Sequence, residues 1–365
     1  MKKEKLMKAL KQIPIWVWIV WGLSLIIALV QVVANASETV ADTINGSIAA
    51  IVRAALAYLF CLLPLSLAEL LLISLPLWIL LSILLVKHLV KRCHPLRIVS
   101  GFLSLLPFLY ILFTLTLGMG YAATPLADKM GLSVKSEITA KELLFTAERL
   151  KDESQTLLLQ LEQEEGNTSP THTVSERNRL LIAAYESLAE KYAFVKTFSV
   201  GVKPILLSRP MAYTGITGVY SFFTGEANLN TSYPAYSTWF TAAHEMAHAR
   251  GFSRENEANF VAFLALYSSE DTYVRYVGCI NLLQYVMNAL SYADQDAFLS
   301  FYQALHEDIR KEYQAYYDYV DTINDHPIRH LADVVNDAYL KGVGTEGTLS
   351  YGLVVELAVA FYRSR

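Results

Sequence analysis

The chain has 365 residues, of which 54% are hydrophobic and 18% are charged, and its mean hydropathy is +0.33. An ordinary soluble domain is about 45–50% apolar and about 25% charged, so this composition argues against a wholly soluble enzyme, a disordered chain and a nucleic-acid-binding protein. The net charge of −4 is unevenly distributed: residues 1–120 carry ten Lys or Arg and four Asp or Glu, against twenty and thirty in the remainder. This asymmetry indicates a basic, apolar membrane anchor over 1–121 and an acidic, globular domain over 122–365.

The first predicted membrane helix covers residues 14–34. These twenty-one residues carry no charge, and they follow a start that holds five lysines and one glutamate. A helix needs roughly 20 apolar residues to cross a ~30 Å hydrocarbon core. The run is too long for a cleaved signal peptide, and further apolar runs follow it.

The apolar run 54–86 predicts two elements. It contains Pro64, Glu69 and Pro76, and as one straight helix it would extend roughly 50 Å, which exceeds the bilayer core. We therefore expect an amphipathic or re-entrant helix over 45–64 and a second span over 66–86. Glu69 then caps the start of this span at the interface, although an ionisable group inside a membrane is otherwise a functional candidate.

The third predicted span covers residues 98–121. The basic segment 87–97 precedes it, and two spans separate this segment from the lysine-rich start, so both basic segments lie on one side. Positive residues favour the cytoplasmic side. We expect a multi-pass plasma-membrane protein with a cytoplasmic N-terminus and an extracytoplasmic C-terminal domain.

Helical patterns dominate residues 122–365. Thr139 and Glu142 form a capping box before an amphipathic run that continues to Gly166. Residues 198–240 are instead rich in Gly, Ser, Thr and aromatic residues, which predicts a small sheet with tight turns. The domain is therefore expected to be mainly α, of the α+β class. The three cysteines are too far apart to indicate a metal site or a disulfide framework.

The segment that indicates chemistry is His244-Glu-Met-Ala-His248, which fits the HExxH pattern. On a helix, residues i and i+4 share a face, so both imidazoles can bind one metal ion, and Glu245 lies beside them as a general base for the attacking water. Imidazole ligands suit Zn²⁺, and a catalytic zinc site needs a third protein ligand. The other interpretation is two surface histidines on a charged helix, but the apolar flanks argue for a buried helix.

Two acidic residues compete for the role of third ligand. Gly251 is placed to end the HExxH helix, and Ser253 to cap a second helix that contains Glu255 and Glu257. These two carboxylates lie roughly 200° apart around the helix, so only one can face the metal. We favour Glu255, because Asn259 follows one turn later on the same face and can orient a ligand.

The segment HEMAHARGFSRENEAN, the upstream SRPMAYTGITGVYSFFTGEANLN and the three-span front resemble the bacterial membrane family of domain of unknown function 3810, over essentially the whole chain. That family is a predicted zincin with no established substrate, so the resemblance implies a zincin-like fold and a metallopeptidase activity. Glu255-x-x-Ala-Asn259 is also similar to the ExxA(D/N) element of gluzincin peptidases, whose first Glu binds zinc. Only six residues separate His248 from Glu255, fewer than in many gluzincins. Gly251 is similar to the metzincin glycine, but Arg254 stands where the third metzincin histidine would fall.

Hydrolysis of an amide also needs a donor for the developing oxyanion. Tyr276 is the favoured candidate, and the alternatives are Tyr213, Tyr220, His326 and His330. His326 and His330 could also hold a second metal or be exposed loop histidines. Glu226, Asn228 and Asn230 alternate along a predicted strand, so they either line the cleft or form the polar face of an ordinary sheet. In zincins an edge strand at this position binds substrate as an added strand.

The sequence therefore predicts a membrane-anchored zinc metallopeptidase with one Zn²⁺ per chain, held by His244, His248 and Glu255. Its expected partners are the lipid bilayer and a peptide or protein substrate at the cell envelope, without nucleic acid. Two other classes remain open: a catalytically silent zinc-containing sensor or assembly module, and a hydrolase of a different amide. The intact Glu245 argues against the silent module, because a pure binding site needs no general base.

Overall fold

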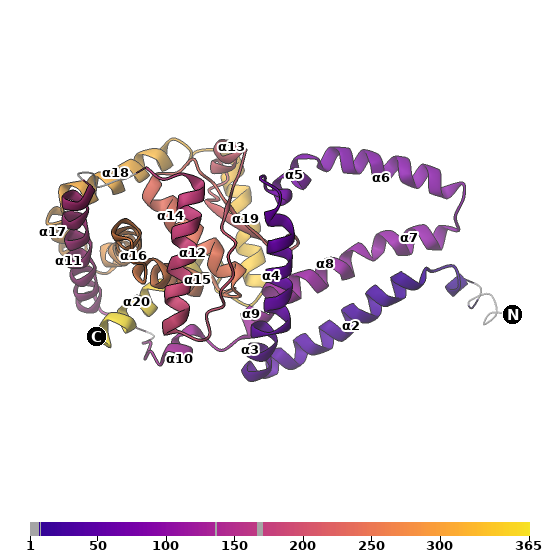
Figure 1. Ribbon diagram of the computed structural model, residues 1–365, viewed down its shortest axis with the longest axis horizontal. Coiled ribbons are helices and arrows are strands. Elements are labelled where there is room, and N and C mark those ends of the chain that lie inside the picture. The colour runs from indigo at the N-terminus through magenta and orange to yellow at the C-terminus, as the bar shows by residue number, and fades with distance from the viewer. Residues whose placement is uncertain (1–6, 8, 136, 166–170) are drawn as a thin grey trace.

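The computed structural model describes residues 7, 9–135, 137–165 and 171–365. The described chain is mainly helical and has two parts, an arm of apolar helices that begins at the N-terminus and a globular part that contains the C-terminus (Figure 1). Two further helices lie between these parts, across the ends of the arm helices.

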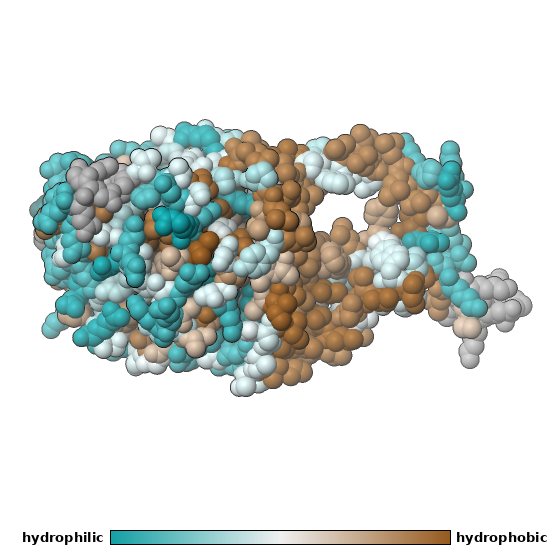
Figure 2. All heavy atoms as spheres, viewed as in Figure 1, coloured by the Kyte–Doolittle hydropathy of each residue, from teal (hydrophilic) through white to brown (hydrophobic). Residues whose placement is uncertain are grey.

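The arm presents apolar side chains outward along its length. It consists of α2 (Ile15–Ala36), α5 (Leu67–Ile73), α6 (Leu75–Val90), α7 (Pro95–Leu103) and α8 (Leu105–Phe113). Figure 2 shows mostly apolar surface along the arm, hydrophilic residues at its remote end, and a largely polar globular part. Three helical runs are long and apolar enough to cross a membrane, namely Ile15–Ala36, Glu38–Cys61 and Pro95–Ala122. The chain is therefore a membrane protein by the length and composition of its helices.

The predicted spans 14–34 and 98–121 correspond to two of these runs, but the predicted span 66–86 is not one straight helix. Helices α5 and α6 meet at 65°. The break has a local cause: the Ser74 hydroxyl donates to the Leu70 carbonyl at 2.5 Å, and Pro76 in the first turn of α6 has no N–H to donate. The pair counts as a fourth span only when both helices are taken together.

The segment predicted as a separate helix over 45–64 lies between the arm and the globular part. It forms α3 (Glu38–Gly46) and α4 (Ile48–Cys61), and α4 contacts both the third long run and the central strand of the sheet. Figure 1 shows α3 and α4 running across the ends of α2 and α8. The separate helix predicted over 45–64 is thus a run over Glu38–Cys61 that is broken at Ser47, and by length and composition this run is itself a candidate membrane span.

The third long run contains a widened turn close to the globular part. Beyond α8 come the π-helical turn η1 (Thr114–Gly118) and α9 (Met119–Ala122). The carbonyl oxygens of Thr116 and Leu117 accept hydrogen bonds from side chains outside this helix. Such π-helical turns are frequent at functional sites.

The globular part is built around three buried helices, α14, α15 and α16, which pack against one another. The long helix α11 lies along α16, and α20 packs against both. Thr139 and Glu142 form the predicted hydrogen bonds at the start of α11. The helices are α10 (Leu126–Met130), α11 (Ala140–Glu165), α12 (Val174–Lys191), α13 (Ser208–Ala212), α14 (Ala235–Ala249), α15 (Glu255–Tyr267), α16 (Thr272–Ala293), α17 (Gln295–Gln303), α18 (Glu307–Asp321), α19 (Pro327–Gly342), the 3₁₀ helix η2 (Gly347–Tyr351) and α20 (Val354–Arg363).

A small sheet forms within the predicted range 198–240. Its strands are β1 (Lys203–Pro204), β2 (Gly218–Ser221) and β3 (Glu226–Leu229), in the order β1-β3-β2. β3 pairs parallel with β1 and antiparallel with β2. Helix α14 packs against β2 and β3, so the sheet lies directly beside the HExxH helix.

Two buried carboxylates join the arm to this sheet. Glu226 on β3 accepts hydrogen bonds from the backbone N–H groups of Leu67 and Ala68 at 3.0 and 2.9 Å. Glu69 on α5 accepts in return from the N–H groups of Leu206 and Leu207 at 2.8 and 2.7 Å. The Glu69 carboxylate thus accepts hydrogen bonds from the backbone of the globular part. The start of α5 is thereby fixed to the sheet.

The structure agrees with neither interpretation of the alternating polar residues on and after β3. Glu226, Asn228 and Asn230 neither line the cleft nor form a solvated face, because all three are buried. Asn228 donates to the Val219 carbonyl, and Asn230 to the Ile216 carbonyl. Their role is to satisfy backbone groups inside the molecule.

Candidate metal centre

The HExxH segment lies on α14, whose side chains are buried along nearly its whole length. His244 and His248 are one turn apart on the same face, as their spacing predicts, and their ring planes are perpendicular. Trp239, Phe240 and Met246 anchor the helix in the main core. The two imidazoles are therefore presented by a helix that has little freedom to move.

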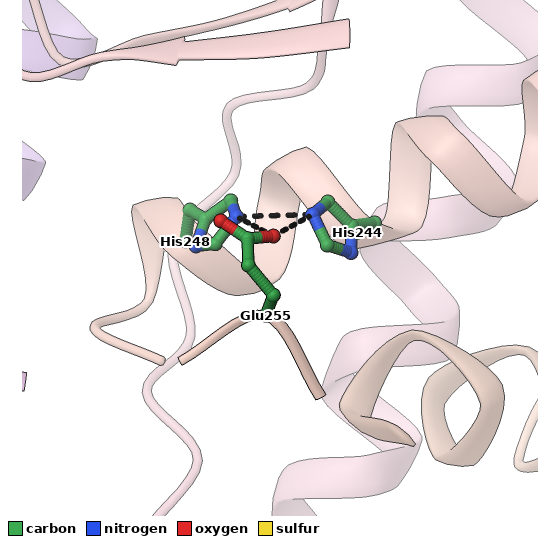
Figure 3. A group of neighbouring side chains, drawn as sticks. All are labelled: His244, His248 and Glu255. Carbon is green, nitrogen blue, oxygen red and sulfur yellow. Dashed lines mark hydrogen bonds and ion pairs between the residues drawn. The ribbon is translucent and has the colours of Figure 1, made fainter. Parts of the chain in front are cut away.

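Three ligand atoms converge at this face (Figure 3). His244 Nε2 and His248 Nε2 are 3.0 Å apart, and Glu255 Oε2 lies 3.1 Å from the first and 3.4 Å from the second. Ligands at 2.0–2.2 Å from a tetrahedral zinc ion lie roughly 3.3–3.5 Å from one another. The observed triangle therefore has about the size that a single zinc ion needs.

The hydrogen bonding of these residues also fits a metal. His248 Nδ1 lies 2.7 Å from the Phe252 carbonyl oxygen; it donates there, so Nε2 is the nitrogen that faces the candidate metal position and gives up its proton when a metal binds. Among the described residues, the two imidazole nitrogens are the polar side-chain atoms that face the buried Glu255 Oε2. A buried carboxylate oxygen facing two imidazole nitrogens is the donor set that zinc prefers. The residues present thus fit the ion that the sequence predicts.

A tight turn brings Glu255 to the histidines. Gly251 has a φ of +95°, a conformation that glycine adopts without strain, and its N–H donates to the His248 carbonyl at 2.9 Å. The predicted end of α14 at this glycine is therefore confirmed. Ser253 does not cap α15 as predicted; its hydroxyl donates to the Leu117 carbonyl at 2.7 Å.

Side chains of the anchor hold this turn from outside. Asn45 donates to the Gly251 carbonyl oxygen at 3.0 Å. The buried guanidinium of Arg53 donates to the side chain of Asn45 at 2.8 Å and to its carbonyl oxygen at 2.7 Å. A Cβ on Gly251 would lie 2.5 Å from Arg53 Nη2. The turn and the anchor are therefore in direct contact.

The structure separates the two acidic residues that compete for the metal. Glu257 accepts hydrogen bonds from the Leu126 N–H and from Arg254, both at 2.9 Å, and Arg254 also donates to the carbonyl oxygens of Tyr121 and Ala123. Glu257 thus fixes the segment that follows the third long run. Glu255 alone of the two is brought to the histidines.

Glu245 lies beside the three candidate ligands and is not a member of their group. Burial raises the pKa of its carboxyl to about 7, while the neighbouring histidines oppose the shift. Among the described residues its Oε2 has no hydrogen-bond partner. A Cβ on Gly218 of β2 would lie 2.6 Å from Glu245 Oε1. The carboxylate is therefore wedged between α14 and the outer strand of the sheet.

These groups open into a cleft of about 810 Å³. Residues of α14, α15, β2 and α19 line this cleft. The third long run contributes Leu117 and Tyr121. Among the described residues, β2 has one paired edge, toward β3, and its residues Gly218, Val219 and Tyr220 line the cleft. No described strand pairs with the outer edge of β2, and the backbone N–H of Tyr220 donates to the Glu245 carboxylate.

The structure does not bring Tyr276 to this centre. It lies in the core on α16 with 1% of its surface exposed, packed against Tyr273, and it does not line the cleft. The alternatives His326 and His330 are also absent from the lining. His326 instead caps α19, where its Nδ1 accepts from the Ile328 N–H at 3.3 Å.

Four other tyrosines line the cleft, and three of them were not predicted. Tyr220 was among the sequence candidates, whereas Tyr121, Tyr285 and Tyr339 were not. Tyr285 hydrogen-bonds Asn259, the residue that was expected to orient a ligand. The hydroxyl groups of Tyr121 and Tyr339 lie 3.2 Å apart. No local pattern marks these tyrosines, because each reaches the cleft from a different helix.

The family model described as protein of unknown function (DUF3810) matches residues 46–359. The chain therefore belongs to this family. Searches among curated proteins and among solved structures each gave no match.

Proposed function

We propose that the chain is a membrane-anchored, zinc-dependent metallopeptidase that hydrolyses peptide bonds at the cell envelope. The observation that carries this proposal is the triangle of His244, His248 and Glu255 with a separate buried carboxylate, Glu245, beside it. A binding site needs the first three residues only. The fourth residue is what general-base catalysis requires.

A zinc ion held by the triangle would polarise a substrate carbonyl and lower the pKa of a water molecule to around 7. Glu245 has a carboxyl pKa of about 7, so near neutral pH it can accept the proton of the attacking water. It can then hand that proton to the leaving amine. Because Gly218 approaches Glu245 closely, a chain lying along β2 would pass directly over this carboxylate.

The substrate would bind by adding a strand to the outer edge of β2. Main-chain hydrogen bonds to a free strand edge recognise an extended polypeptide whatever its side chains. Tyr220 and Tyr339 both line the cleft and are our candidates for donating to the developing oxyanion. An edge strand beside the general base favours a peptide over another envelope amide.

The globular part is proposed to lie outside the cytoplasm. In Figure 1 the turn between α6 and α7 and the start of α2 both lie at the end of the arm that is remote from the globular part. Residues 87–97 in this turn are basic. Positive residues favour the cytoplasmic side, which places the metal centre on the opposite face of the plasma membrane.

The test is to purify the full-length protein and its Glu245→Gln variant, measure bound zinc by mass spectrometry of metals, and compare hydrolysis of fluorescent peptide mixtures. We expect equal zinc in both, and activity in the variant lower by the ~10²–10⁴-fold typical of a lost general base. Zinc with no peptide hydrolysis in either protein would favour the silent module. Zinc with equal hydrolysis by both would refute the mechanism, and absence of bound zinc would refute the metal.

A further inference from the structure

One wall of the cleft is an amphipathic helix, α19, that the rest of the globular part leaves largely uncovered. Helix α19 packs mainly against η2, and its residues Ile328, Leu331 and Val335 face the cleft. Leu331 is 63% exposed and Val335 is 61% exposed. Exposed apolar side chains grouped at a site indicate a binding surface, so this wall suits an apolar segment.

This wall is continuous with the part of the chain that enters the membrane. The ring of Tyr339, near the end of α19, lies 6.3 Å from the ring of Phe113 on the membrane-spanning helix α8. Its hydroxyl lies 3.2 Å from that of Tyr121 at the end of the same span. Leu117, also from this span, lines the cleft. The cleft therefore begins at the end of the third long run that is nearest the globular part.

We infer that the substrate is the segment of a membrane-anchored polypeptide immediately outside the bilayer. This inference rests on the proposed peptidase function. The unpaired edge of β2 recognises polypeptide backbone, which a lipid molecule lacks. The apolar wall of α19, reaching to Phe113, recognises the apolar residues that border a membrane anchor. The scissile bond then lies between these two features, over Glu245.

The test uses the full-length protein in vesicles of phosphatidylcholine and phosphatidylglycerol with one fluorescent peptide mixture in three forms. The mixture is coupled directly to a lipid headgroup, coupled through a 40-residue Gly/Ser spacer, or left free. The spacer has a root-mean-square reach of about 35 Å. The spaced peptide therefore stays tethered to the vesicle, but its mean distance from the bilayer is larger than that of the direct form. We expect the direct form to be cleaved at least tenfold faster than the spaced form. The bonds cleaved in the direct form should all lie at the same distance from the lipid headgroup.

A matched pair of variants tests the wall itself. Val335 faces the cleft, whereas its neighbour Val334 is 52% exposed and does not line it. Val335→Ser should slow cleavage of the direct form five- to tenfold, and Val334→Ser should leave it unchanged. Equal cleavage of the direct and spaced forms would overturn the inference while the peptidase function stands. An equal loss of cleavage rate in both variants would also overturn the inference, because it would show that α19 acts by contacting lipid. No cleavage of any form by the zinc-loaded protein would refute the peptidase function itself.

Discussion

The side chain of Asn45 donates a hydrogen bond to the carbonyl oxygen of Gly251 at 3.0 Å, across 206 positions of the sequence. Asn45 belongs to the layer between the arm and the globular part, and Gly251 lies in the turn that joins His248 to Glu255. Arg53 binds the other atoms of Asn45 and is itself buried. The anchor thus takes part in positioning Glu255, the proposed third ligand, and the candidate metal centre contacts both parts of the chain.

The first prediction concerns this contact. Gly251→Ala places a methyl group 2.5 Å from Arg53 Nη2, so the turn must shift and Glu255 with it. We expect zinc affinity to fall by the 10–100-fold typical of changes in the groups that orient ligands, measured by competition with a chelator. Gly131→Ala is the matched control. It also has positive φ, at +66°, but no atom within 4 Å, so it should lower stability by about 1–2 kcal/mol without changing zinc affinity.

The second prediction distinguishes the two acidic residues. Glu255→Gln removes the charge of a proposed ligand and should weaken zinc binding by more than 100-fold, beyond the usual effect of an outer-shell change. Glu257→Gln should keep the metal, because this carboxylate contacts Arg254 and the Leu126 N–H instead. It should lower thermal stability. If Glu257→Gln loses zinc and Glu255→Gln retains it, the ligand set is wrong.

Much of the site could be predicted because its members are close in sequence. His244, His248 and Glu255 lie within two helices and one turn, so helix periodicity and the terminating Gly251 suffice to bring them together. The same reasoning correctly separated Glu257 from the histidines. The length of the apolar runs likewise predicted the spans over 14–34 and 98–121, because hydrophobicity over about 20 residues is a strong local signal.

The remainder depended on tertiary contacts that no local pattern records. Tyr276 resembled a cleft residue by type alone, but α16 is buried along most of its length and directs this side chain into the core. Glu226 resembled a residue on a strand face, yet it satisfies the start of α5, more than 150 positions earlier. The break at Ser74 combines a hydrogen bond from the Ser74 hydroxyl with Pro76 in the next turn. Hydropathy detects neither feature. Long-range pairing of this kind requires the folded structure.

The third prediction concerns the close approach of Gly218 to the general base. A Cβ there would lie 2.6 Å from Glu245 Oε1 and 2.8 Å from Thr241 Cγ2, so Gly218→Ala must displace the carboxylate or the strand. We expect the peptidase kcat to fall by 10-fold or more while bound zinc is unchanged, since the three ligands are not touched. Gly342→Ala, with no atom within 4 Å, is the control and should leave kcat unaltered. Loss of zinc from Gly218→Ala would contradict this geometry.

The fourth prediction concerns pH. Burial alone would lower the pKa of His248, but the adjacent Glu255 carboxylate raises it to about 9 in the metal-free site. Zinc must displace that proton, so its affinity should increase about tenfold per pH unit up to about pH 9. Chelator competition at pH 6.5, 7.5 and 8.5 measures this slope, and a flat profile would show that His248 is already neutral.

The same ionisation makes the stability of the metal-free protein fall with rising pH, whereas zinc affinity rises. A pKa raised above the unfolded value of about 6.5 contributes stability that is complete below that value and is lost as pH rises through about 9. We therefore expect the metal-free protein to become less stable between pH 6.5 and 9, and the gain in Tm on adding zinc to widen over this interval. His248→Gln should remove both trends.

The fifth prediction tests the orientation in the membrane with single cysteines in intact cells. Cys61 and Cys93 are replaced by serine, while Cys279 is fully buried and stays. Gln295→Cys, exposed at the start of α17, should react with a membrane-impermeant maleimide on intact cells. Lys91→Cys, exposed beyond the end of α6 at the remote end of the arm, should react only after the membrane is permeabilised. The reverse pattern would place the metal centre in the cytoplasm, and labelling of both positions before permeabilisation would contradict an arm that crosses the bilayer.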